Sequence, residues 1–174
     1  MMDVLISDTS VVIDLERSGL IEQVFALPFR FIVPDALYVQ EIRDYGGERL
    51  CALGLEVREL TGKQVAEAQR LRGLERRISI HDSYALSLAK GEVGILLAGD
   101  GALRRLAEAE EVRCHGVLWV LDRLEEHGIV AFPGLHRGLE LIVAHPRCRL
   151  PREAVDRRLK RYAASKDSDS KGEQ

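Results

Sequence analysis

Apolar positions along the chain follow two alternating patterns. Short, nearly continuous apolar runs predict buried strands, and longer segments with apolar residues three or four positions apart predict amphipathic helices. The predicted strands are residues 4–7, 29–33, 55–60, 94–98 and 112–115. The predicted helices are residues 10–17, 34–45, 61–71, 79–90 and 102–110, with further helices to about residue 162. Pro34 suits a first helical turn, Thr61 and Ser79 can cap helices, and Gly46-Gly47 can end one.

The strict alternation of strand and helix predicts the fold class. Short links between strand and helix are typical of parallel βαβ units with helices on both faces of the sheet. We therefore expect an α/β protein built as a three-layer α/β/α sandwich. Residues 1–130 would form this domain, and residues 131–163 a C-terminal helical extension packed on it. The polar, charged segment 164–174 is predicted to be a disordered tail.

Composition narrows the class of protein further. The chain has 174 residues, 46% of them apolar and 5% aromatic, with a net charge of -3. These values favour a real aliphatic core and exclude a strongly basic nucleic-acid binder, although one basic face could still contact RNA. The three cysteines lack CxxC spacing, which favours reduced thiols over a disulfide framework or zinc site. No secretory leader or membrane-spanning run is found, so a soluble, cytoplasmic protein is expected.

Four acidic residues occupy chemically notable positions in this pattern. Asp8 and Asp100 follow the carboxyl ends of predicted strands, beyond which ligands of parallel sheets bind. Glu41 lies on the helix 34–45, along an apolar stripe, and Asp82 heads the inward face of the helix 79–90. That stripe consists of Leu37, Tyr38, Ile42 and Tyr45.

Each of these acids also has an ordinary structural interpretation. Asp8 and Asp100 could cap the helices that follow them, and Glu41 could be salt-bridged at the edge of its stripe. Asp82 could form a capping box with Ser79. Taken together, however, four converging carboxylates would repel and raise one another's pKa values. A hard divalent cation such as Mg²⁺ or Mn²⁺ removes that penalty and suits phosphodiester hydrolysis.

Four sequence blocks carry a family resemblance. "LISDTSVVIDL", "FIVPDALYVQEI", "SIHDSYALSLA" and "LLAGDGALRRLAE" resemble the acidic blocks of PIN-domain nucleases. The resemblance implies a Mg²⁺- or Mn²⁺-dependent ribonuclease on a five-stranded parallel sheet of order 3-2-1-4-5. It also implies that Asp8, Glu41, Asp82 and Asp100 are the catalytic and metal-binding acids, with the hydroxyl of Ser10 in support.

The resemblance suggests a biological role and also shows two departures. Many bacterial and archaeal members of the family are VapC-like toxins, each neutralised by a small antitoxin protein. Here Ala98 stands two residues before Asp100, where a hydroxyl or amide side chain is frequent. The chain also continues past the usual end of compact VapC-like toxins, with a basic segment of arginines and lysine between residues 147 and 161. We interpret that segment as a docked helix with a solvated basic face.

Basic residues near the acids are candidates for contact with RNA. Arg72, Arg76 and Arg77 precede Asp82, and Arg104 follows Asp100. An exposed helix end, which favours cations, would give the same pattern. His81 neighbours Asp82, but adjacent helical residues point about 100° apart, so we expect it to face elsewhere.

The leading hypothesis is a metal-dependent endoribonuclease that acts as a VapC-like toxin. The alternatives are an RNA-processing PIN nuclease that is not a toxin and a non-catalytic PIN-fold binding module. The partners expected are RNA, a small antitoxin and a second copy of the chain in a homodimer, with no membrane.

Overall fold

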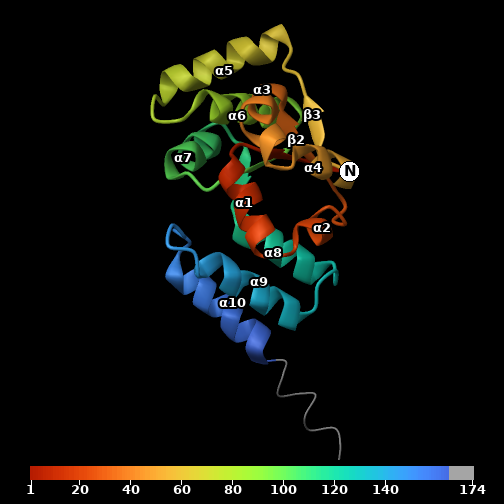
Figure 1. Cartoon of the computed structure of the whole chain (residues 1–174). Helices are drawn as coiled ribbons and strands as arrows, with labels where there is room; N and C mark the ends of the chain where they lie inside the picture. The colour runs from red at the N-terminus through yellow and green to blue at the C-terminus, as the bar shows by residue number, and fades with distance from the viewer. Residues whose placement is uncertain (165–174) are drawn as a thin grey trace, which may run out of the picture. The chain divides into compact units, whose positions relative to one another are not determined.

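The computed structural model, which describes residues 1–164, contains a five-stranded parallel sheet (Figure 1). Its strands are β1 (Met2–Ile6), β2 (Phe29–Pro34), β3 (Glu56–Arg58), β4 (Ile95–Leu97) and β5 (Arg113–His115). They lie in the order β3-β2-β1-β4-β5, and each neighbouring pair is parallel. The predicted fold class, an α/β/α fold with this sheet order, is confirmed.

Helices connect the strands as the apolar pattern predicts. The helical elements are α1 (Thr9–Arg17), α2 (Ile21–Val24), α3 (Asp35–Leu37), η1 (Tyr38–Ile42), η2 (Arg43–Tyr45), α4 (Gly47–Leu53), α5 (Gly62–Leu74), α6 (Ile80–Gly91), α7 (Gly101–Ala109), α8 (Val117–Glu126), α9 (Phe132–Val143) and α10 (Arg152–Ala164). The short helices α2 and α4 were not predicted from the sequence. The left-handed backbone at Gly46 ends η2 as expected, but Gly47 begins α4 instead of a loop.

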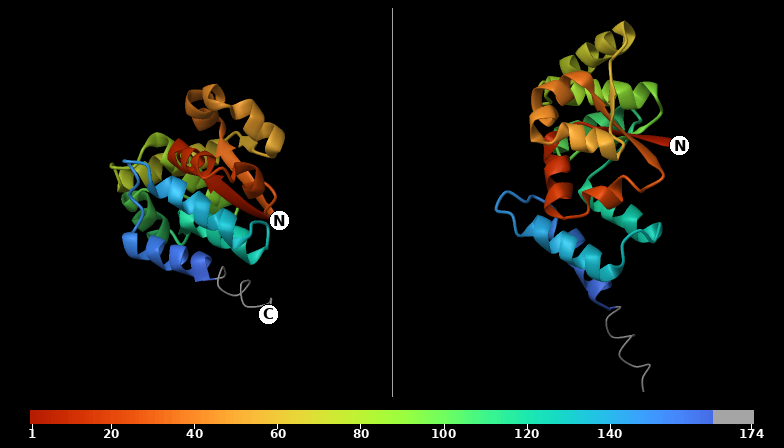
Figure 2. Two further views of the ribbon diagram at one scale, coloured as in Figure 1. Left: turned by 60° about the horizontal axis from the view of Figure 1, so that its bottom comes forward. Right: turned by 45° about the vertical axis from the view of Figure 1, so that its right-hand side comes forward.

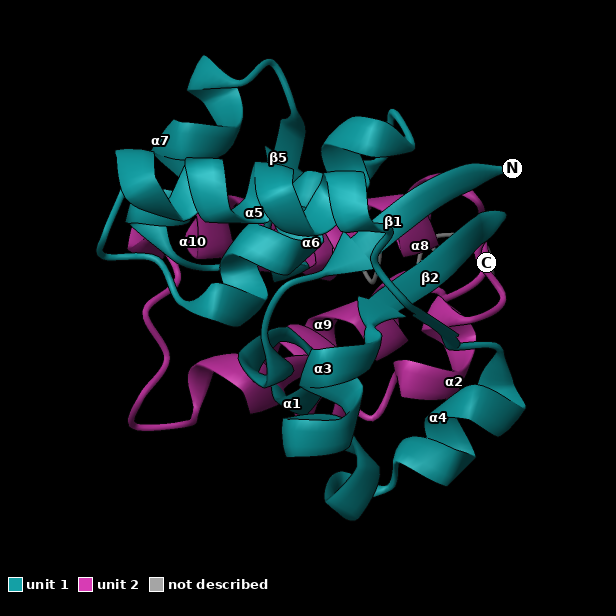
Figure 3. Ribbon diagram, turned by 90° about the horizontal axis from the view of Figure 1, so that it is seen from above, with its two compact units in different colours: residues 1–13, 28–117 teal, residues 14–27, 118–174 magenta. Residues whose placement is uncertain are grey.

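The chain divides into two compact units, which Figure 3 shows in different colours. The first unit comprises residues 1–13 and 28–117 and contains the whole sheet. The second comprises residues 14–27 and the chain from residue 118 onward. The domain boundaries predicted from the sequence stay predictions. Apart from Ala164, the last residue of α10, the predicted tail lies outside the described residues.

In the first unit, one face of the sheet is covered by two successive helices. Helix α6 packs across β1, β2 and β4, and α5 packs on the outside of α6 (Figures 1 and 2). Leu5, Ile32 and Leu96 from the strands meet Leu86 of α6 and Leu103 of α7 in a fully buried cluster. This burial holds the start of α6 above the central strands, which positions Asp82.

In the second unit, α10 packs against α9. The Phe132 and Tyr162 rings lie 5.7 Å apart, and Arg158 donates two hydrogen bonds to Asp122 of α8. Arg157 and Lys160 of α10 are exposed. A packed helix with a solvated basic face is therefore the arrangement observed. In residues 1–164, every helix is too short or too polar to cross a membrane.

Candidate active site

The central strands place Asp8 and Asp100 at one edge of the sheet. β1 pairs with β4 up to Ile6 and Leu97, and the hydroxyl of Ser7 donates to the Leu97 carbonyl at 3.3 Å. Asp8 and Asp100 follow within a few residues of this last pairing. Because the chain passes from β1 to β2 on one side and returns through β4 on the other, strand order reverses between β1 and β4. The two acids therefore flank the topological switch point, where open α/β sheets bind ligands.

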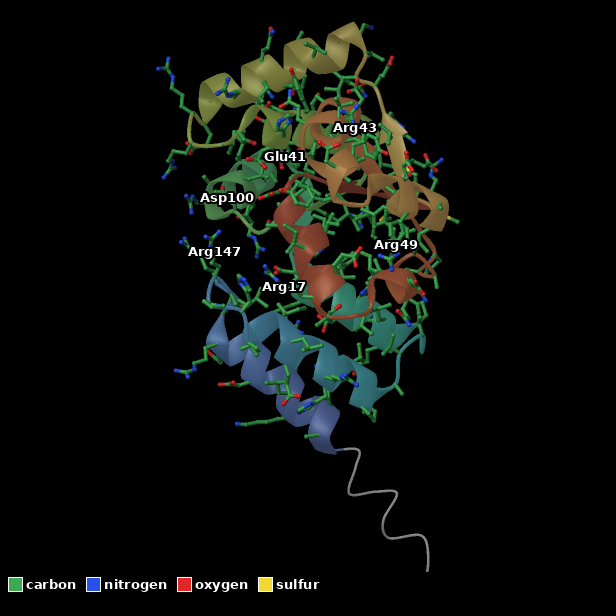
Figure 4. The ribbon with its side chains drawn as sticks, in the orientation of Figure 1. Arg17, Glu41, Arg43, Arg49, Asp100 and Arg147 are labelled. Carbon is green, nitrogen blue, oxygen red and sulfur yellow. The ribbon has the colours of Figure 1, made fainter. Side chains whose placement is uncertain are left out.

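Each of these two acids also caps the helix that follows it. Asp8 Oδ1 accepts a hydrogen bond from the Ser10 backbone N–H at 2.9 Å, and Asp100 Oδ1 accepts one from the Leu103 N–H at 2.9 Å. In both residues Oδ2 accepts no hydrogen bond from residues 1–164. The capping and ligand interpretations are therefore compatible, because each uses a different oxygen. Asp100 is solvent-exposed and Asp8 half-buried (Figure 4 labels Asp100).

Asp82 lies in the capping box that the sequence predicts. Its Oδ2 accepts from the Ser79 N–H at 2.8 Å, and its own N–H donates to the Ser79 hydroxyl at 3.0 Å. Burial raises the pKa of the Asp82 carboxyl, hydrogen bonding from the backbone and the side chain of Ser79 lowers it, and the negative charges of Asp8 and Asp100 raise it further. The net shift is upward. Asp8, Asp82 and Asp100 are thus electrostatic neighbours, although they come from three different segments.

Glu41 is carried by an irregular helix. The segment from Asp35 to Tyr45 passes from α-helix to the π-helical turn η1 and then to the 3-10 turn η2. The wider turn places Leu37 and Ile42, five positions apart, in the core, whereas Tyr45 is 80% exposed. The expected stripe with Tyr45 is therefore wrong, because it assumed regular α-helical spacing. π-turns inside helices occur frequently at functional sites.

A hydroxyl that the sequence did not single out joins two of the acids. Thr9 Oγ1 donates to Glu41 Oε2 at 2.7 Å and lies 3.4 Å from Asp8 Oδ1. Ser10 reaches Asp8 through its backbone N–H, and its side chain is exposed. The supporting role of the Ser10 hydroxyl stays a prediction. Thr9 could have been noticed only as one of two hydroxyls after Asp8, since periodicity gives no partner for it.

His81 faces Glu41 and not solvent. It is 8% exposed, its Nε2 lies 3.0 Å from the Gln40 side-chain oxygen, and it is 4.0 Å from Glu41 Oε1. Its Nδ1 is buried and has no hydrogen-bond partner in the described chain. The angle expected between adjacent helical residues turns the His81 side chain away from Asp82 and toward Glu41, another candidate acid. Figure 4 shows Glu41 on the helix after β2.

The donor chemistry of these acids fits a divalent cation, but their oxygens do not form a closed ligand set. Among residues 1–164, no three acidic, histidine or cysteine side chains lie close enough together to hold a metal ion as they stand. The negative charges of Asp8 and Asp100 nonetheless add repulsion to the burial that raises the pKa of Asp82. A cation would relieve that repulsion, and carboxylate oxygens are the ligands that Mg²⁺ and Mn²⁺ prefer.

The candidate RNA-binding arginines have three different surroundings. Arg72 and Arg76 line a surface cleft, whereas Arg77 is paired with Glu75 through two guanidinium hydrogen bonds of 2.8 and 2.7 Å. That pairing lowers the pKa of Glu75 to about 2. Arg104 turns toward the Ala98 carbonyl, at 3.5 Å, beside the ends of the central strands.

The fold and these residues define an α/β protein with an acidic candidate site at the carboxyl edge of a parallel sheet. The family model DUF3368, described as a PIN domain, matches residues 4–164. The chain therefore belongs to this PIN-domain family, and the resemblance seen in the acidic blocks is confirmed. PIN domains are generally nucleases. The match includes the helices α8 to α10. A comparison with curated proteins gives no match.

Proposed function

We propose that this PIN-domain protein is a Mg²⁺- or Mn²⁺-dependent endoribonuclease whose site comprises Asp8, Glu41, Asp82 and Asp100. The observation that carries the proposal is the position of three acids from separate segments at the switch point, where the charges of Asp8 and Asp100 add to the burial that raises the pKa of Asp82. A structural protein has no need for such repulsion, and perturbed carboxyls in this position are typical of functional sites.

The chain's own groups supply the positioning. The backbone N–H of Ser10 holds one carboxylate oxygen of Asp8, and the backbone N–H of Leu103 holds one carboxylate oxygen of Asp100. In each carboxylate the second oxygen has no side-chain partner in residues 1–164. The hydroxyl of Thr9, the residue after Asp8, donates a hydrogen bond that orients the Glu41 carboxylate. When bound, a hard divalent cation supplies charge neutralisation and polarisation of a phosphate oxygen. The acids therefore gather the charge that such a cation would balance.

The biological role belongs to the same proposal. A VapC-like toxin, neutralised by a small antitoxin, is the leading role, and an RNA-processing nuclease or a non-catalytic binding module are the alternatives. Induced expression should arrest growth if the toxin role is correct, and Asp100→Asn should abolish the arrest. Growth unaffected by an active nuclease would favour RNA processing, whereas cation binding without RNA cleavage would favour the binding module. A homodimer and a cytoplasmic location remain predictions.

An RNA-cleavage assay tests the activity itself. Asp8→Asn and Asp100→Asn keep the caps, because Asn and Asp cap helices about equally well, but they remove a negative ligand. Cleavage should stop in EDTA and fall by about 100-fold or more in each variant, since metal chemistry of this kind contributes several kcal/mol. Asp156→Asn, which removes an exposed carboxylate from α10, is the control and should cleave normally. Full activity in EDTA, or in both site variants, would refute the proposal.

A further inference from the structure

A cleft opens on the sheet-containing unit between the end of α5 and the start of α6. Its volume is about 600 Å³, and it is lined by Gln69, Arg72, Gly73, Arg76 and Ile80. Two of the five lining residues are arginines and none is acidic. The cleft therefore presents positive charge, with glycine in place of a side chain at one lining position.

The two arginines differ from their neighbours in the partners they have. Arg70 is paired with Glu67 and Glu110, and Arg77 is paired with Glu75. Arg72 and Arg76 make no ion pair with residues 1–164, and both are exposed. Their charges are therefore available to an external anion, whereas most of the charge on the paired arginines is already compensated.

The cleft lies close in sequence and space to the candidate site. Ile80, which lines it, is the first residue of α6, and Asp82 lies in the same first turn. The amino end of α6 also carries the positive pole of the helix dipole, which adds modest attraction for an anion. An RNA strand with its scissile phosphate at the acids could thus extend directly over Ile80 into the cleft.

We propose that this cleft binds backbone phosphates of single-stranded RNA flanking the cleaved bond, through Arg72 and Arg76. The guanidinium fork matches phosphate oxygens in pairs, which makes arginine suited to this contact. The choice of RNA as occupant rests on the proposed nuclease function. An acidic peptide of a partner protein is the competing occupant, and the salt dependence of RNA binding separates the two.

Two kinds of variant probe the cleft without touching the acids. Arg72→Gln/Arg76→Gln removes the charges, and Gly73→Gln fills the space without changing charge. A Cβ at Gly73 meets no atom within 4 Å, and the same holds for Gly62 at the other end of α5, so Gly62→Gln is the matched steric control. Arg113→Gln is the charge control, because Arg113 is exposed at the amino end of β5.

Binding of a labelled oligouridylate to the full chain is measured by fluorescence anisotropy in EDTA over a range of salt concentrations. Each single-strand phosphate contact adds about 0.7 to the slope of log affinity against log salt. The double variant should lose about 1.4 of slope and bind about 25-fold more weakly at 0.1 M salt. Gly73→Gln should weaken binding about fivefold or more, the value of one lost contact. Both controls should bind like the wild type.

The outcomes distinguish the cleft from the catalytic proposal, because binding in EDTA requires no hydrolysis. An unchanged slope in the double variant overturns the cleft proposal even if the chain cleaves RNA, as does a wild-type chain that binds no RNA. The expected loss of slope in a chain that cleaves no RNA supports the cleft and overturns the nuclease function. If the cleft served an acidic peptide instead, the oligouridylate slope would not change.

Discussion

The hydrogen bond between Thr9 and Glu41 gives the sharpest local prediction. Thr9→Val removes the hydroxyl and keeps the shape of the side chain, so the main loss is the 2.7 Å bond to Glu41 Oε2. Hydrogen bonds to charged acceptors contribute about 1.5–3 kcal/mol when water is excluded. Because the Glu41 side chain is 40% exposed, water competes for it, and we expect about 1 kcal/mol.

A double-mutant cycle measures this contribution directly. The free energy of unfolding by urea is determined in EDTA for the wild type, Thr9→Val, Glu41→Met and the double variant. The coupling energy between Thr9 and Glu41 should be about 1 kcal/mol. The matched control is a cycle in which Ser10→Ala takes the place of Thr9→Val, since the Ser10 hydroxyl makes no hydrogen bond to Glu41. The coupling energy between Ser10 and Glu41 should be within about 0.3 kcal/mol of zero. Equal coupling energies for Thr9 and Ser10 would refute the hydrogen bond between Thr9 and Glu41.

Three further predictions concern stability. Hydrogen bonds from Arg70 and Lys90 lower the pKa of Glu67 in the folded chain from 4.5 to about 2. The free energy of unfolding should therefore fall as the pH drops from 4.5 to about 2, and it should fall less steeply in Glu67→Gln. The pH dependence expected from Asp82 has the opposite sign, because its pKa is raised in the folded chain and its ionised form therefore disfavours folding. In EDTA, the wild type should lose stability relative to Asp82→Asn as the pH rises above 3.8. Gly94→Ala should destabilise by about 1–3 kcal/mol in urea unfolding, since its Cβ would lie 2.8 Å from Leu5 Cδ2 and 2.9 Å from a backbone oxygen. An equal loss in Gly99→Ala, where a Cβ has open space, would contradict that reasoning.

Much of the fold was predictable because the buried strands carry near-continuous apolar runs. Parallel strands that are covered on both faces have such runs, because both faces are buried. Asp8 and Asp100 interrupt the apolar runs shortly after β1 and β4 end. The capping residues Thr61 and Ser79 were predictable for a local reason, since each forms a capping box with the residue three positions on.

Other features depend on geometry that periodicity does not encode. The π-turn η1 changes the spacing within one helix, so that Tyr45 leaves the core and Glu41 is carried on an irregular turn. The bond from Thr9 to Glu41 and the packing of His81 beside Gln40 join distant segments, and only the folded chain brings them together. The short helix α2 has too few residues to show a helical repeat.

The central claim is that the acids at the switch point bind a divalent cation. Calorimetric titration of the full chain with Mn²⁺ tests it most directly, using the wild type, Asp8→Asn and Asp100→Asn. We expect Mn²⁺ to bind the wild type and to lose at least about tenfold in affinity in each variant, since even residues that only support metal ligands contribute 10- to 100-fold. Equal Mn²⁺ affinity in all three proteins, or no binding to any of them, would contradict it.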